Sequence, residues 1–150
     1  MSSIETAVRE LADRAELADL VARHSRWIDE ARWDETDRIF TEDVVTVSPR
    51  GEARGIEALL ALVRKGHDRF ARTMHHKGSL IIDLDGDTAA VRASDLAVFV
   101  VDDATASVAA GIAHYRARRT PDGWRFSGLE IEPVALTAAL DRAPLPTGRA

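Results

Sequence analysis

The sequence predicts an α+β fold in which N-terminal helices close a strongly curved antiparallel sheet. The first 70 residues carry apolar side chains at helical spacing, whereas residues 75–133 read as long strands separated by tight turns. Helices followed by a run of strands are typical of α+β proteins. Because long strands with small residues on one side can curl into a cone, we expect an internal pocket whose wide end the helices close.

The helical half of the chain is interrupted by one short β-rich segment. Residues 4–40 are expected to be helical, with Asp34 capping a second short helix near their end. Residues 43–48 are rich in valine and predict a strand, and residues 49–51 predict a turn. A second amphipathic helix is expected over residues 55–70.

Four long strands are expected in the second half. They cover residues 75–84, 88–101, 106–119 and 124–133. Asp85-Gly86-Asp87 and Pro121-Asp122-Gly123 are sequences typical of tight turns. Beyond Val134 we expect a short helix rich in alanine and leucine, and then a proline-rich tail.

Composition indicates one domain and excludes several classes of function. The 150 residues form a single unit, 1–150, with a core at about 10–133 and a C-terminal extension at 134–150. The net charge of −5 argues against a nucleic-acid partner. The absence of cysteine excludes disulfides and thiolate nucleophiles. No apolar run approaches the roughly 20 residues of a membrane span and no signal pattern is seen, so no membrane partner and a cytoplasmic location are expected.

Strand alternation predicts which side chains face the pocket. Five residues of the strand at 88–101 share the inner side, namely Val91, Ala93, Asp95, Ala97 and Phe99. In the next strand the inner set is Ser107, Ala109, Gly111, Ala113 and Tyr115. Arg92 has the opposite parity. A β-bulge would invert this assignment.

An aspartate and a histidine far apart in the chain predict acid–base chemistry. Asp29 ends the first apolar helical stripe and His75 opens the first of the long strands. An imidazole titrates near neutral pH, and a carboxylate can fix its tautomer and raise its basicity. His76 points the other way. His24 lies on the same helical stripe and reads either as a second proton-transfer group or as a core histidine with a hydrogen-bond partner.

The order of several short motifs resembles a known family. The motifs are Ile28-Asp29, Trp33-Asp34, Phe40-Thr-Glu-Asp43, Gly55-Ile-Glu-Ala58, Thr73-x-His75, Asp85-Gly-Asp-Thr-Ala89 and Asp122-Gly-Trp-Arg-Phe126. Over about residues 10–133 this set resembles the SnoaL-like branch of the nuclear transport factor 2-like superfamily. Within it the chain is most similar to the scytalone dehydratase-like and bile-acid dehydratase-like group. In that group an Asp at the end of the first helix pairs with a His on the long strand, and these positions match Asp29 and His75.

The same resemblance shows where the chain departs from the group. Ser48 stands where its dehydratases carry a tyrosine, and Phe99 where they place a second catalytic histidine. Ala109 and Gly111 replace a polar Ser/Asn pair, and His24 replaces an aromatic residue of the first helix. The resemblance therefore implies a roomier site with fewer polar groups.

These arguments predict a cofactor-independent dehydratase, isomerase or cyclase that acts on an apolar, ring-containing or polyketide-like molecule. The candidate catalytic residues are His75, Asp29, His24 and Asp95, with no metal site. The candidate substrate-binding residues are Trp27, Ser48, Phe70, Val91, Ala93, Ala97, Phe99, Ala109, Gly111 and Phe126. The aromatic residues among them read as core residues or as ligand-stacking residues.

Two other functions stay open at this point. The first is a non-catalytic binding or accessory protein of the same fold, since several polar pocket positions of the related dehydratases are missing here. The second is an epoxide hydrolase-type enzyme, which would need Asp29, Arg92 and Asp95 around one water molecule. The family resemblance also implies a homodimer or homotrimer packed through the outer surface of the sheet.

Overall fold

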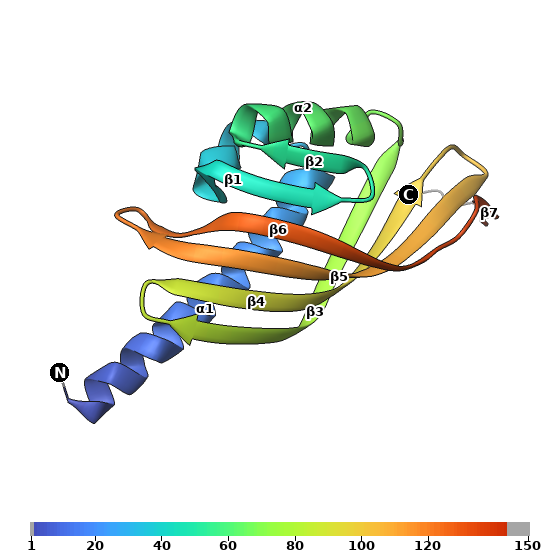
Figure 1. Cartoon of the computed structure of the whole chain (residues 1–150). Helices are drawn as coiled ribbons and strands as arrows, with labels where there is room; N and C mark the ends of the chain where they lie inside the picture. The colour runs from blue at the N-terminus through green and yellow to red at the C-terminus, as the bar shows by residue number, and fades with distance from the viewer. Residues whose placement is uncertain (1, 144–150) are drawn as a thin grey trace, which may run out of the picture.

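The computed structural model describes residues 2–143, which form helices packed against one curved sheet (Figure 1). The helical elements are α1 (Ser3–Asp29), the short 3-10 helix η1 (Trp33–Arg38) and α2 (Ile56–His67). The strands are β1 (Phe40–Ser48), β2 (Gly51–Arg54), β3 (Arg72–Asp85), β4 (Thr88–Val100), β5 (Thr105–Thr120), β6 (Gly123–Leu136) and β7 (Leu140–Asp141). This arrangement confirms the predicted α+β class.

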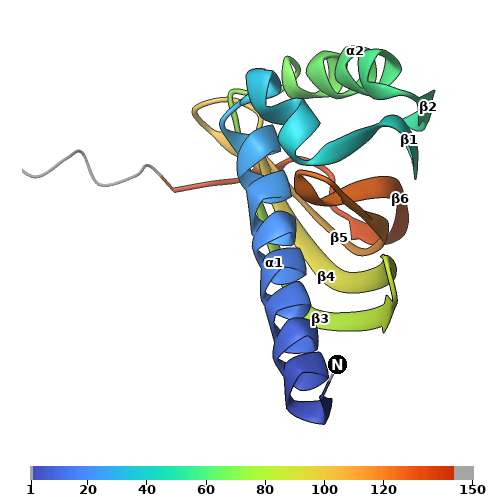
Figure 2. The same cartoon turned by 90° about the vertical axis from the view of Figure 1, so that its left-hand side faces the viewer.

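The sheet is antiparallel except at one junction. Its seven strands include the path β2-β1-β6-β5-β4-β3, and β7 pairs with β5. Only β1 and β6 run parallel, which lets the N-terminal and C-terminal parts of the chain share one sheet. The sheet is strongly curved and does not close on itself. Helix α1 runs along its inner side while α2 covers the end formed by β1 and β2 (Figures 1 and 2).

Helix α1 begins and ends at identifiable signals. Ser2 and Glu5 form a reciprocal capping box at its start. Its end was predicted too late, because Ala31 adopts a positive φ of 52° and breaks the helix after Asp29. The prediction that Asp34 caps the next helix is also wrong, since Arg32 holds that position and no side chain caps η1.

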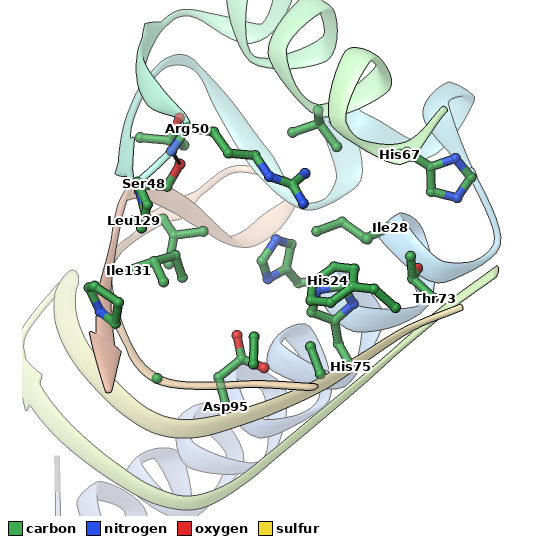
Figure 3. A pocket seen from close by; sticks show the side chains of 18 of the residues that line it. His24, Ile28, Ser48, Arg50, His67, Thr73, His75, Asp95, Leu129 and Ile131 are labelled. Carbon is green, nitrogen blue, oxygen red and sulfur yellow. Dashed lines mark hydrogen bonds between the residues drawn. The ribbon is translucent and has the colours of Figure 1, made fainter. Parts of the chain in front are cut away.

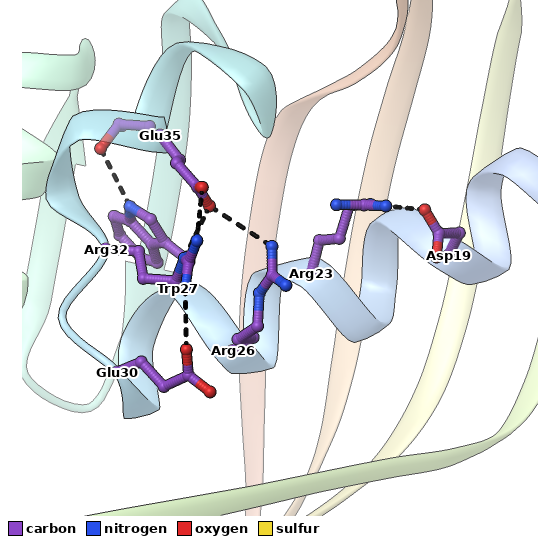
Figure 4. A network of polar contacts seen from close by, with 8 residues as sticks. Asp19, Arg23, Arg26, Trp27, Glu30, Arg32 and Glu35 are labelled. Atoms are coloured by element: carbon purple, nitrogen blue, oxygen red, sulfur yellow. Dashed lines mark hydrogen bonds and ion pairs between the residues drawn. The ribbon is translucent and has the colours of Figure 1, made fainter.

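The junction between α1 and η1 is held by polar contacts (Figure 4). Arg32 donates two hydrogen bonds to the carboxylate of Glu35, at 2.9 and 3.0 Å. The buried Trp27 indole donates to the hydroxyl of Thr36 at 2.9 Å. These bonds fix the last turn of α1 and therefore the position of Asp29.

The strands alternate as predicted, with local interruptions. The inner side chains of β4 are buried at Val91, Ala93 and Ala97, whereas Ser94 and Leu96 are exposed. On β5 the register shifts between Ala110 and Gly111, and both residues then face the same hollow. A Cβ added at Gly111 would lie 2.8 Å from the Glu132 carbonyl oxygen of β6, so the close approach of these strands requires glycine.

The prediction of a helix beyond Val134 is wrong. Strand β6 continues to Leu136, which pairs with Ala109 of β5. Hydrogen bonding to an existing strand satisfies this segment's backbone, so β pairing overrides its helix propensity. The predicted proline-rich tail extends into residues 144–150, outside the described residues.

A partly buried ion pair joins α1 to the sheet and supports a stability prediction. Asp13 accepts two hydrogen bonds from Arg119, both at 2.8 Å, and a third from the Trp124 indole at 3.0 Å. Asp13→Asn removes the charge and the bidentate geometry, so we expect the free energy of unfolding to fall by about 2 kcal/mol. Denaturant unfolding measures it, with Asp19→Asn in the exposed Arg23 pair as a control that changes little.

The same carboxylate gives the prediction a pH dependence. The Arg119 guanidinium, opposed by burial, holds the pKa of Asp13 below its ordinary value of 3.8. The unfolded chain therefore binds this proton more readily than the folded chain as the pH falls. We expect the stabilisation to be complete well above pH 4 and to disappear as the pH falls through the lowered pKa. The difference between wild type and Asp13→Asn should shrink accordingly.

Candidate functional site

A cavity of about 290 Å³ lies between α1, α2 and the inner face of the sheet (Figure 3). Most of its lining is apolar and comes from α1, α2 and strands β1, β3, β4, β5 and β6. Its volume is at the lower end of ligand pockets in proteins. A few polar side chains stand among the apolar ones, and they decide what the cavity can do.

Asp29 and His75 are in direct contact at one side of this cavity. The His75 ring lines it, and its Nδ1 lies 2.7 Å from Asp29 Oδ1. The backbone N–H of His75 donates to Asp29 Oδ2 at 2.8 Å, and the Thr73 hydroxyl donates to Oδ1 at 2.9 Å. The three bonds fix the carboxylate in one orientation, so the predicted pair is formed and preorganised.

The carboxylate occupies a position that local helix electrostatics disfavours. Asp29 is the last residue of α1, where the helix dipole opposes a negative charge. Burial also raises its pKa, but the hydrogen bonds from the His75 ring and backbone and from Thr73 outweigh burial and keep the pKa below its ordinary value. Asp29 is therefore ionised at neutral pH. A residue that violates the electrostatic preference of a helix end, as Asp29 does, is typical of a functional position.

The pairing determines which nitrogen of His75 is available to a ligand. An ionised carboxylate can only accept hydrogen bonds, so Nδ1 carries the proton that faces Asp29. The other nitrogen, Nε2, then has a free lone pair in the neutral ring, and no residue in the range 2–143 is hydrogen-bonded to it. The ring is 12% exposed and borders the cavity, so Nε2 can act as a base towards a molecule bound there.

His24 lies deeper in the fold and is neutral. Its Nδ1 and the Tyr115 hydroxyl form a 2.8 Å hydrogen bond, and the ring packs among Trp27, Phe40 and Phe126. Burial, together with positive charge on Lys77 and His75, holds the pKa of His24 well below its ordinary value. Burial likewise raises the pKa of Tyr115, so its hydroxyl keeps its proton. His24 lines the cavity as an uncharged hydrogen-bonding group.

A lysine that sequence reasoning did not select stands beside this group. The Lys77 side chain is 2% exposed, and its Nζ lies 3.3 Å from Ser25 Oγ and 3.6 Å from Asp95 Oδ1. Burial lowers the pKa of Lys77, and the charges of Asp95 and Asp29 oppose this effect. The sequence does contain a pattern that selects Lys77. This residue follows Thr73 and His75 at every second position along the strand, so its side chain is expected on the same face.

The opposite parity places His76 outside, as predicted. It is exposed, whereas Thr73, His75 and Lys77 line the cavity. Asp95 also lines the cavity, where its Oδ1 is buried without a hydrogen bond. Thr46 Oγ1 is a second buried oxygen of the lining without a partner. These oxygens leave acceptor capacity that a bound molecule can use.

Seven of the ten predicted substrate-binding residues line the cavity. They are Trp27, Ser48, Phe70, Ala97, Phe99, Ala109 and Gly111. The placements of Val91, Ala93 and Phe126 in the lining are wrong, because all three are at most 1% exposed in the hydrophobic core. They belong to the close-packed hydrophobic core and not to the cavity wall.

The position of Arg92 bears on the epoxide hydrolase alternative, and two other possibilities, a metal site and a membrane helix, can be checked in the same structure. Arg92 is absent from the lining and faces the outer side of β4, opposite Asp95, so it cannot complete an Asp–Arg–Asp set with Asp29. Between residues 2 and 143 no group of three or more histidine, aspartate or glutamate side chains is arranged to hold a metal ion. Within the same range, no helix is long and apolar enough to cross a membrane.

The fold agrees with comparisons to known proteins. The model of the SnoaL-like domain matches residues 9–130, and the chain belongs to this family within the nuclear transport factor 2-like superfamily. An uncharacterised protein of Mycobacterium tuberculosis is 32% identical over 127 residues, which cover 80% of this chain and 84% of that protein.

Two solved structures show the same fold. A candidate scytalone dehydratase of Novosphingobium aromaticivorans superposes with a TM-score of 0.79 at 23% identity, over 94% of this chain and 97% of that one. A hexachlorocyclohexane dehydrochlorinase, LinA-type3 of Novosphingobium barchaimii, gives a TM-score of 0.80 at 20% identity, over 96% and 99% of the two chains. At these identities the likeness establishes the fold.

Proposed function

We propose that this protein is a cofactor-independent lyase or isomerase that moves a proton on an apolar, ring-containing small molecule. The observation that carries the proposal is the contact between His75 and Asp29, with the His75 ring lining a mostly apolar cavity and its Nε2 without a hydrogen bond to residues 2–143. Dehydration, isomerisation and cyclisation all begin with such a proton transfer. The names of the two solved relatives denote eliminations, which supports the same class of chemistry.

In the elimination form of the reaction, Nε2 of His75 takes a proton from a carbon of the substrate. The electrons of that C–H bond form a C=C bond, and the bond from the adjacent carbon to its leaving group breaks. Asp29 holds the ring and stabilises the imidazolium. The Lys77 ammonium also lines the cavity, where its positive charge can stabilise negative charge that develops on the substrate.

In this proposal the remaining polar groups bind and orient the substrate. His24 is neutral and supplies a hydrogen bond at the deep end of the cavity. Asp95 holds Lys77 and offers an unpaired oxygen to a substrate hydroxyl. The wall formed by Phe70 and Phe99 packs against the apolar ring system.

A non-catalytic binding protein is the alternative, and the geometry of His75 favours the enzyme. A histidine kept only for packing would have both ring nitrogens enclosed by the fold and would not border the cavity. His75 instead has one nitrogen bound to a carboxylate and the other unengaged by the described residues, at the border of the cavity. A purely binding site would not require this preorganised proton acceptor.

The test is proton exchange at carbon in deuterated buffer, followed by NMR. The panel contains cyclic ketones and cyclic compounds with a hydroxyl or halide β to an acidic C–H bond. We expect the protein to accelerate exchange or elimination of at least one member. Asp29→Asn should lower that rate by about 10²-fold because the imidazole loses its orientation and its counter-charge.

Asp34→Asn is the matched control, because Asp34 is an exposed aspartate outside the cavity lining. We expect this variant to keep the wild-type rate. A panel in which no member reacts faster with the protein than in buffer contradicts the proposal. So does an Asp29→Asn variant as active as the wild type.

A further inference from the structure

Arg50 brings a positive charge to the cavity without a matching negative one. It belongs to the turn between β1 and β2, and its guanidinium extends into the cavity (Figure 3). Among residues 2–143 no carboxylate forms an ion pair with Arg50, and its guanidinium donates no hydrogen bond to them. A guanidinium carries five N–H donors, so this side chain has its full binding capacity left for a ligand.

The guanidinium is held by aromatic rings next to the proposed base. Its Cζ lies 5.9 Å from the centroid of Phe70 and 5.7 Å from that of Phe99. The His75 ring contacts the same Phe99 edge-on, with centroids 5.6 Å apart. Since Phe99 touches both groups, one small molecule lying along this wall can reach the imidazole and the guanidinium together.

Helix α2 leaves room for this side chain at one position. A Cβ added at Gly66 would overlap Arg50 Nη1 and come within 2.9 Å of Cζ. Gly66 is buried near the C-terminal end of α2. Its φ is not positive, so the backbone conformation does not require glycine at this position. The absence of a side chain at Gly66 therefore makes room for the Arg50 guanidinium, which packs over this position.

The charges around the cavity indicate what Arg50 would bind. Lys77 is balanced by Asp95, and His75 is paired with Asp29. Burial and the positive charge of Arg69 both lower the pKa of Arg50, and an anionic ligand would oppose both effects. A planar guanidinium matches a carboxylate with two parallel hydrogen bonds, most strongly where water is partly excluded.

We propose that the substrate carries a carboxylate, which Arg50 binds while the ring of the substrate packs on Phe70 and Phe99. The reacting C–H bond then faces Nε2 of His75. The inference rests on the proposed function, because it takes the cavity as the substrate site. It adds the substrate class, which is a small cyclic or aromatic carboxylic acid in its anionic form.

The test compares two ligands of equal shape, 2-naphthoate and 2-naphthamide, by titration calorimetry. We expect the wild type to bind the carboxylate at least about tenfold more tightly than the amide. Arg50→Met keeps an unbranched apolar stem, and we expect it to abolish this preference while leaving amide binding unchanged. Arg54→Met, in which a largely exposed arginine paired with Glu52 is lost, should keep the preference.

Gly66→Ala provides a second variant that separates binding from folding. Alanine in a helix is more stable than glycine by up to about 1 kcal/mol, so this protein should unfold at the same or a higher temperature. The new methyl group nevertheless displaces the guanidinium, and the carboxylate preference should fall as it does in Arg50→Met.

Each outcome supports or overturns the inference. Loss of the preference in both variants, with retained stability in Gly66→Ala, supports it. A wild type that binds the two ligands equally or binds neither, or an Arg50→Met variant that keeps the preference, overturns it. Binding requires no turnover, so failure here leaves the His75–Asp29 proposal intact. If the protein does not accelerate proton exchange, its preference for the carboxylate over the amide can still be measured.

Discussion

Replacing His75 with glutamine should reduce proton exchange and elimination by about 10³-fold, within the range that a positioned general base contributes. Glutamine keeps a side chain of similar length that can still hydrogen-bond to Asp29. It has no basic nitrogen at the position of Nε2. The loss should therefore appear in kcat, and the KM of the substrate should change little, because the apolar wall that binds the ring remains.

His76→Gln is the matched control for this experiment. The two histidines are adjacent on β3 and face opposite sides, so the control changes the same residue type on the exposed surface. We expect wild-type kinetics and wild-type stability. Equal activity of His75→Gln and wild type would remove the base from the mechanism. Equal losses in both variants would point to a general effect on β3.

The part of the site that the sequence predicts is the part set by motif order and strand parity. Asp29 and His75 are 46 positions apart and nothing local connects them, yet the ordered motifs define a fold that brings them together. Parity then predicts the inner face of β4 correctly, and that of β3 only as far as Gly78, because a bulge between Gly78 and Ile81 inverts the alternation. Applied to β3 with the same rigour, it also selects Lys77.

Strand parity does not predict how deep within the curved sheet a side chain lies. Val91 and Ala97 share one face of β4, but the first is sealed in the core and the second borders the cavity. Alternation assigns a face and carries no information on how far α1 and the opposing strands stand from it.

The sequence could not predict that Arg50 enters the cavity, and the reason is different. In sequence it is one residue of a Pro-Arg-Gly turn, where an arginine ordinarily points into solvent. Its entry into the cavity depends on a missing Cβ on α2 and on two aromatic rings from separate parts of the chain. Such a contact belongs to the assembled fold and leaves no local pattern.

Replacing Lys77 with methionine should lower the free energy of unfolding by about 3 kcal/mol, as expected when a buried charge loses its partner. The partner is Asp95, whose Oδ1 has no hydrogen bond and depends on the ammonium 3.6 Å away. The double variant Lys77→Met/Asp95→Leu removes both charges, and it should recover most of the lost stability. Denaturant unfolding of the single and double variants measures the coupling, with the exposed Lys65→Met as the control.

The double variant also separates folding from chemistry. If apolar residues at both positions are tolerated by the fold, the ion pair is not what holds β3 and β4 together. A double variant with wild-type stability and slower proton exchange would then show that the pair is kept for the substrate. Wild-type exchange in the same variant would show that Lys77 does not stabilise charge on the substrate, and that His75 and Asp29 suffice. A stable Lys77→Met single variant would contradict the electrostatic argument at its first step.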